Sequence, residues 1–237
     1  MKRAFLTRVL APMLVAASPM ILSAETPAER LDAAAVVFKE IMSVPDKGIP
    51  QELLEDAHCV VIVPGVKKAA FVVGGKYGRG FATCRQTKGR AWGPPAAVRM
   101  EGGSIGWQIG GSESDVILLV MNENGMKKLL ESKFTLDANA SAAAGPIGRT
   151  AQASTDATMH AEILSYSRSR GLFAGLSLGG ATLRADLDEN QELYGKPLDN
   201  KDILLGNVKV PPAANQLISL LSKYSRVEEG ERARTKK

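Results

Sequence analysis

The stretch from Ser165 to Ala181, S-Y-S-R-S-R-G-L-F-A-G-L-S-L-G-G-A, constrains the fold more than any other part of the chain. A polar run in which Ser, Tyr and Arg alternate is followed by apolar runs rich in glycine, alanine and serine. Such small residues allow the backbone to approach another segment closely. Apolar runs interrupted by glycine are typical of strands joined by tight turns. The stretch therefore predicts tightly packed β-structure.

The same stretch contains G-L-S-L-G, from Gly175 to Gly179, which matches the nucleophile-elbow pattern of hydrolases. That motif needs a strand-turn-helix context and a histidine later in the chain. Both histidines, His58 and His160, precede Ser177, and the residues after it continue a strand pattern. We therefore interpret Ser177 as a structural residue.

A metal site has similarly little support, since such sites need three or four ligands. The least unfavourable set is Asp156, His160 and Glu162. We expect no cofactor and no enzymatic activity, and a hydrolase or metalloenzyme is the weakest of the alternatives.

Residues 1–24 have the pattern of a secretory signal peptide, with a basic start, an apolar run and small residues before Glu25. The apolar run is short and interrupted by two prolines, so it does not predict a membrane-spanning helix. We expect cleavage near Ala24 and a periplasmic location. The mature chain then has one domain over residues 25–225 and a charged, disordered tail over residues 226–237.

The charge of the mature chain gives no indication of a nucleic-acid partner. The full sequence carries a formal charge of +5, and the signal peptide accounts for three of the basic residues and no acid. The tail over residues 226–237 carries the remaining excess, so the body is neutral. Nucleic-acid binders usually concentrate basic residues on one face. We therefore predict no nucleic-acid partner.

One window of the neutral body is nevertheless basic, because no acid occurs from Cys59 to Met100. Within it, Gly75–Arg79 predicts the glycine-rich tip of a β-hairpin between strands Ala69–Gly74 and Gly80–Arg85. Exposed glycine amides beside cations can hold an anion. Taken singly, each cation also fits an ordinary solvated surface. As a cluster they predict a lipid- or anion-binding site at Lys67, Lys68, Lys76, Arg79 and Arg85.

The two cysteines, Cys59 and Cys84, both lie in strand-like runs. Disulfides persist in export compartments, and a bridge closing this loop would add about 3 kcal/mol of stability. Two buried free thiols fit the sequence equally well.

Apolar residues recur at helical spacing in three segments. Thr26-Pro27 begins an amphipathic helix that we expect to dock on its own domain, because its polar face is not the basic face expected for insertion into an anionic membrane. Asn122 caps a helix over Glu123–Ser132, and Pro211–Tyr224 forms a C-terminal helix. Asn190–Gly195 predicts a turn.

The strand patterns lie between these helices. Cys59–Pro64 predicts a strand ended by proline, Gly102-Gly103 a turn, and Asp115–Met121 a buried strand. Three more strands are predicted from residue 162 to residue 187. The sequence thus predicts an α+β fold, with a mainly antiparallel β-sheet or barrel-like core, an N-terminal amphipathic helix, one mid-chain helix and a C-terminal helix.

Several stretches together resemble the SYLF domain family. They are C-V-V-I-V-P-G-V-K-K-A-A-F-V-V-G-G-K-Y-G-R-G, W-G-P-P-A, G-W-Q-I-G-G, D-V-I-L-L-V-M-N, A-A-G-P-I-G-R, the Ser165–Ala181 stretch and N-Q-E-L-Y-G, and they span roughly Leu31 to Leu205. The resemblance implies a module without a catalytic motif, whose eukaryotic relatives bind phosphoinositide membranes and in some cases actin. It places lipid contact at Lys67, Lys68, Lys76, Arg79 and the Leu31–Met42 helix.

The sequence therefore predicts a non-catalytic binding module of the bacterial cell envelope. It would bind anionic phospholipid, or a membrane surface, through the basic glycine-rich hairpin. The alternative is a structural protein of the periplasm that acts through protein contacts, with a protein partner or as a homo-oligomer through edge strands.

Overall fold

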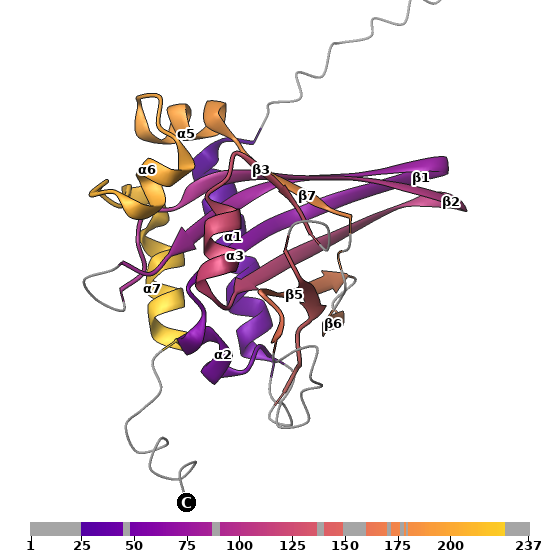
Figure 1. Ribbon diagram of the computed structural model, residues 1–237, viewed down its shortest axis with the longest axis horizontal. Helices are drawn as coiled ribbons and strands as arrows, with labels where there is room; N and C mark the ends of the chain where they lie inside the picture. Colours follow the sequence, from indigo (N-terminus) through magenta and orange to yellow (C-terminus); the bar gives the residue numbers. More distant parts are fainter. Residues whose placement is uncertain are drawn as a thin grey trace, which may run out of the picture.

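The computed structural model describes residues 25–44, 48–86, 91–136, 140–148, 160–169, 172–175, 178 and 180–225. Over these residues the chain forms an α+β fold, in which a curled and mostly antiparallel sheet is covered by helices (Figure 1). This confirms the predicted fold class. None of the helices in the described ranges combines the length and the hydrophobicity that a membrane span requires.

Two long strands, β1 (Cys59–Cys84) and β2 (Ala96–Val120), form the centre of the sheet. They pair antiparallel from one end to the other, with register shifts after Val63 and after Ala70. The ribbon that they form folds back on itself, since the Cα atoms of Cys59 and Cys84 are only 4.0 Å apart. Each strand therefore contributes two arms to the sheet.

The shorter strands extend this ribbon on both sides. On one side β5 (Ile163–Ser169) pairs with the end of β2, and its far edge pairs with β6 (Leu172–Gly175) and, in parallel, with β4 (Ala142–Ala144). On the other side β7 (Thr182–Ala185) pairs with the start of β2, and β3 (Lys133–Thr135) pairs with β7.

The helices of the described chain are α1 (Pro27–Ser43), α2 (Gln51–Asp56), α3 (Glu123–Leu129), α5 (Leu187–Tyr194), α6 (Asn200–Leu205), a 3₁₀ turn (Pro212–Ala214) and α7 (Asn215–Tyr224). A capping box between Thr26 and Glu29 begins α1, as the T-P-A-E sequence favours. Asn122 caps α3 through a 2.9 Å bond that its side chain accepts from the amide of Gly125. The predicted N-terminal, mid-chain and C-terminal helices are all present.

The sheet has a hydrophobic core on each face. On one face α1 and α7 pack on the sheet, with Phe38 and Leu221 fully buried against residues such as Phe81. This confirms that the amphipathic helix docks on its own domain. On the other face the curled sheet encloses a second core, which includes Met100 and Leu118.

The predicted glycine-rich hairpin is wrong. Residues 75–79 lie inside β1 and pair with residues 99–103 of β2, so they form no tip. Pro64 does not end the first strand either, because the register shift after Val63 accommodates it. Gly102-Gly103 likewise continues β2 and does not turn. Glycine here instead lets two backbone segments pack closely, because a Cβ on Gly80 would lie only 2.0 Å from the carbonyl oxygen of Ile62.

The predicted turn over Asn190–Gly195 is also wrong, because most of it is the last part of α5. The helix ends at Gly195, which has a φ of 69°. Distant backbone groups hold it in place: the side chain of Asn190 accepts a 2.7 Å hydrogen bond from the amide of Ala97, and Tyr194 donates a 2.6 Å bond to the carbonyl oxygen of Pro95.

Candidate anion-binding site

Two of the five predicted cations make contacts inside the protein. The guanidinium of Arg79 lies 2.7 Å from a carboxylate oxygen of Asp186 and 3.0 Å from one of Glu189. Both acids are almost fully buried, and Glu189 also pairs with Arg30 of α1. These carboxylates raise the pKa of Arg79 further above its ordinary value. Arg79 thus joins α5 to the sheet.

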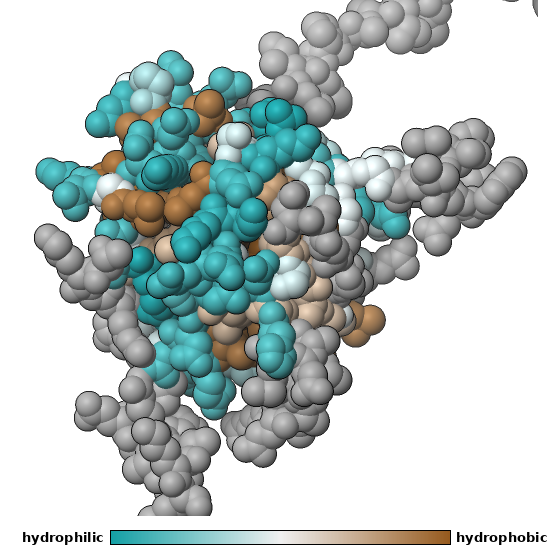
Figure 2. Space-filling view, in the orientation of Figure 1, coloured by the Kyte–Doolittle hydropathy of each residue, from teal (hydrophilic) through white to brown (hydrophobic). Residues whose placement is uncertain are grey.

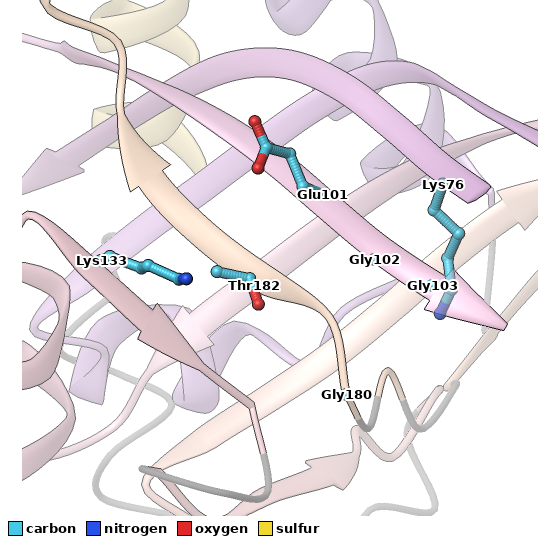
Figure 3. Close-up of a pocket in the computed structure, with 7 residues that line it drawn as sticks. All are labelled: Lys76, Glu101, Gly102, Gly103, Lys133, Gly180 and Thr182. Atoms are coloured by element: carbon cyan, nitrogen blue, oxygen red, sulfur yellow. The ribbon is translucent and has the colours of Figure 1, made fainter.

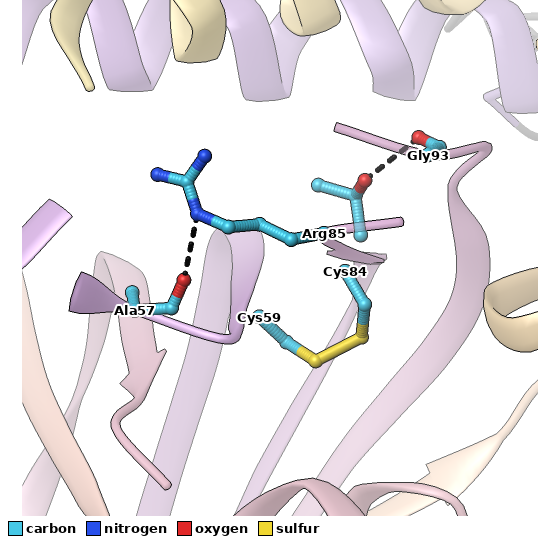
Figure 4. Close-up of a disulfide and its surroundings, with 6 residues drawn as sticks. Ala57, Cys59, Cys84, Arg85 and Gly93 are labelled. Carbon is cyan, nitrogen blue, oxygen red and sulfur yellow. Dashed lines mark hydrogen bonds between the residues drawn. A yellow bond between two sulfur atoms is a disulfide. The ribbon is translucent and has the colours of Figure 1, made fainter. Parts of the chain in front are cut away.

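Arg85, directly after the last residue of β1, is held in a similar way. It donates a 3.0 Å hydrogen bond to the carbonyl oxygen of Ala57 (Figure 4). It also donates a 2.9 Å hydrogen bond to the carbonyl oxygen of Leu54, and its guanidinium stacks 4.3 Å from the ring centre of Trp92. Beside it, Cys59 and Cys84 form a disulfide. Arg85 and the disulfide therefore close the base of the folded ribbon.

The three lysines lie at the opposite end of the ribbon. Lys67 and Lys68 are opposite Glu113 and Ser112 of β2, and Lys76 is opposite Gly102. None of the ion pairs found among the described residues involves these lysines. Desolvation and the nearby charge of Lys68 lower the pKa of Lys76. The structure thus separates the predicted cluster into two structural arginines and three lysines available to a ligand.

Lys76 borders an open pocket of about 390 Å³ that β1, β2, β3 and the start of β7 form together. Its lining consists of Lys76, Glu101, Gly102, Gly103, Lys133, Gly180 and Thr182 (Figure 3). Lys76 and Lys133 approach from opposite sides, and the carboxylate of Glu101 points away from both. That carboxylate lies 3.4 Å from Arg184, which balances its charge. The pocket therefore presents two cations to a ligand.

Three glycines line the pocket. A Cβ built on Gly103 or Gly180 would meet no atom within 4 Å, and Gly180 has a φ of +74° that disfavours other residues. At Gly102 a Cβ would lie 3.7 Å from the Cε atom of Lys76. A larger residue at position 102 would therefore meet the lysine side chain. The exposed glycine backbone beside Lys76 is a surface to which a small anionic group can come close.

Sequence reasoning missed Lys133, Thr182 and the glycines of β2 as parts of one site. They lie far apart along the chain, and only the pairing of β7 with both β2 and β3 brings them together. The glycine doublet at residues 179–180 was the available signal. Of that segment, Ser177 and Gly179 lie outside the described residues, as does Asp156 of the metal hypothesis. In the part that the structure describes, no three His, Cys, Asp or Glu side chains are arranged to hold a metal ion.

Comparison with known proteins gives consistent matches. The sequence model of the Ysc84 family, described as "Las17-binding protein actin regulator", matches residues 101–224. The chain is 35% identical to Protein YSC84 of Saccharomyces cerevisiae over 179 residues, which are 74% of this chain and 38% of that protein. It is 32% identical over 206 residues to LAS seventeen-binding protein 3 of the same yeast, covering 86% of this chain and 44% of that protein.

A human protein, SH3 domain-containing YSC84-like protein 1, is 30% identical over 204 residues, which are 84% of this chain and 59% of the human protein. The chain thus spans about two fifths of the length of the yeast relatives and three fifths of the human relative.

Proposed function

The chain belongs to the Ysc84 family, the SYLF family whose motifs its sequence resembles, and on this premise we propose that it is a non-catalytic module that binds anionic phospholipid surfaces. The observation that carries the proposal is the set of lysines at the open end of the sheet. Lys76 and Lys133 line a glycine-rich pocket, the charge of Lys68 acts on Lys76, and none of the ion pairs among the described residues involves these three lysines. Such a site favours a phosphate or carboxylate over a neutral group.

Electrostatic attraction sets the strength of such binding. A lysine close to an anionic membrane contributes about 1 kcal/mol, and the attraction falls off within a Debye length of about 8 Å at physiological salt. Three lysines together therefore contribute about 3 kcal/mol, roughly a hundredfold in affinity for a membrane rich in anionic lipid. The signal-peptide pattern of residues 1–24 extends the proposal to an exported protein that meets the lipid surface of the cell envelope.

The test is co-sedimentation with vesicles of phosphatidylglycerol and phosphatidylcholine, compared with vesicles of phosphatidylcholine alone, at low and high salt. The triple variant Lys68→Gln, Lys76→Gln, Lys133→Gln should bind the anionic vesicles roughly a hundredfold more weakly than the unchanged chain. A matched control neutralises three exposed lysines elsewhere, Lys196, Lys201 and Lys209. If both variants lose the same affinity, net charge and not this site governs binding; absence of binding at low salt rejects the proposal.

Protein contact is the second candidate function, because one yeast relative is named LAS seventeen-binding protein 3 and the family is described as "Las17-binding protein actin regulator". A partner that copurifies with the chain in the absence of lipid would favour it. The same triple variant separates the two functions: loss of vesicle binding with retention of the partner would assign them to different surfaces.

A further inference from the structure

Leu172 is the most exposed large apolar side chain in the described part of the protein, at 77% of its full accessibility. It is the first residue of β6, and β6 lies at the outer edge of the sheet, beside β5 (Figure 1). Apolar surface gathers over β5 and β6 at this edge, where Ala174 is also exposed (Figure 2). An exposed leucine on a short edge hairpin carries a solvation penalty that a partner surface would remove.

Strand register places Leu172 on the same face of the sheet as Lys68. Leu172 is opposite Ser169 of β5, which lies two residues from Ser167, and Ser167 is opposite Val116 of β2, two residues from Ser114. Ser114 in turn is opposite Val66 of β1. Directly opposite residues share a face, and so do residues two apart in a strand. Leu172 and Lys68 therefore lie on the same side.

Lys76 belongs to this side as well. In its arm of β1 the even-numbered residues Ala82 and Cys84 point into the second core, so Lys76 points to the same face as they do. The charge of Lys68, in the other arm of β1, contributes to lowering the pKa of Lys76. Strands are spaced about 4.8 Å apart, so Leu172, three strands from Lys68, lies roughly 14 Å away across the sheet. One apolar side chain and two cations thus lie on the same face of the sheet.

We propose that Leu172, the first residue of β6, enters the headgroup region of an anionic bilayer while Lys68 and Lys76 contact the lipid phosphates. This inference rests on the proposed lipid function and adds an insertion element to it. An interfacial apolar side chain reaches about 5–10 Å below the headgroups, and lysine stems extend along apolar surface while the ammonium stays with the phosphates. An anionic bilayer matches this face because its acyl layer can take up Leu172 while its phosphates lie at the depth of Lys68 and Lys76.

The experiment attaches a nitrobenzoxadiazole fluorophore to Leu172→Cys without reductant, so that the buried Cys59–Cys84 disulfide stays closed. On anionic vesicles, emission should rise and shift to the blue, and nitroxide groups near the lipid headgroup should quench it. The matched control is Leu187→Cys, an exposed leucine of α5 at 49% accessibility, whose label should not respond.

A second variant measures affinity without a label. Leu172→Ser should weaken binding to the same vesicles roughly tenfold, whereas Leu187→Ser should leave it unchanged. If the unchanged chain binds vesicles but the label at position 172 reports only water and Leu172→Ser binds normally, insertion is rejected and the electrostatic function stands. If the unchanged chain does not bind at all, the proposed function itself is rejected.

Discussion

Lys76 and Arg79 lie three residues apart in β1, yet their surroundings are opposite. Arg79 faces two nearly buried carboxylates, Asp186 and Glu189, which balance its charge. Lys76 faces another lysine and exposed glycine backbone, with no balancing acid among the described residues. The same basic window therefore contributes one residue to stability and another to a potential ligand site. The difference shows that partners contributed by distant segments, not local sequence, decide the role of a cation.

The sharpest test gives both residues the same substitution. Arg79→Met keeps most of the side-chain stem but leaves Asp186 and Glu189 buried with less compensating charge. We expect the free energy of unfolding to fall by about 3–5 kcal/mol. Urea denaturation followed by circular dichroism measures it. If Arg79→Met is as stable as the unchanged chain but loses vesicle binding, the structural role assigned to Arg79 is wrong.

Removing the disulfide tests how strongly it holds the two arms of β1 together. Replacing Cys59 and Cys84 with alanine should lower the free energy of unfolding by about 3 kcal/mol, because the bridge constrains the unfolded chain. Denaturation of the unchanged chain with and without reductant should show a similar loss. A midpoint that neither change moves would mean that strand pairing alone holds the ribbon closed.

The buried carboxylate of Glu189 should also make the free energy of unfolding depend on pH. Burial raises the pKa of Glu189, against the opposing effect of Arg30 and Arg79. Since the folded state then binds the proton more tightly than the unfolded state, stability contributed by this group falls as the pH rises from its ordinary value of 4.5 through the raised value. Glu189→Gln should remove this slope, whereas Glu192→Gln, an exposed position on the same helix, should keep it. Denaturation midpoints between pH 4 and pH 7 measure the effect.

Sequence reasoning succeeded where local rules determine the outcome. The capping box at Thr26, the apolar spacing of α1 and the Asn122 cap predict helices from neighbouring residues alone. The predicted turn at Asn190 failed because α5 is held by the backbone of residues 95–97, almost a hundred residues away. The hairpin at residues 75–79 failed for a related reason: glycine there permits close packing against distant backbone, which in sequence has the same pattern as a turn.

The candidate site was predictable only in part. The absence of acids from residue 59 to residue 100 drew attention to Lys76, but it could not separate this lysine from Arg79, whose partners lie more than a hundred residues later. Lys133 carried no local signal, because its place in the pocket depends on the β3–β7 pairing. Long-range pairing, which periodicity does not encode, was the missing information.

The smallest expected effect completes the comparison between the two residues. Desolvation, and then Lys68, lower the pKa of Lys76, so the folded state binds this proton less tightly than the unfolded state. Its destabilising contribution is full below the lowered pKa and disappears as the pH rises towards 10.5. At neutral pH, Lys76→Met should therefore stabilise the fold by a few tenths of a kcal/mol, since the site is partly exposed to solvent. The same variant should bind anionic vesicles about fivefold more weakly. If Lys76→Met is more stable but binds vesicles more weakly, the charge of Lys76 favours ligand binding and disfavours folding. If the variant loses both stability and vesicle binding, Lys76 is a structural residue like Arg79.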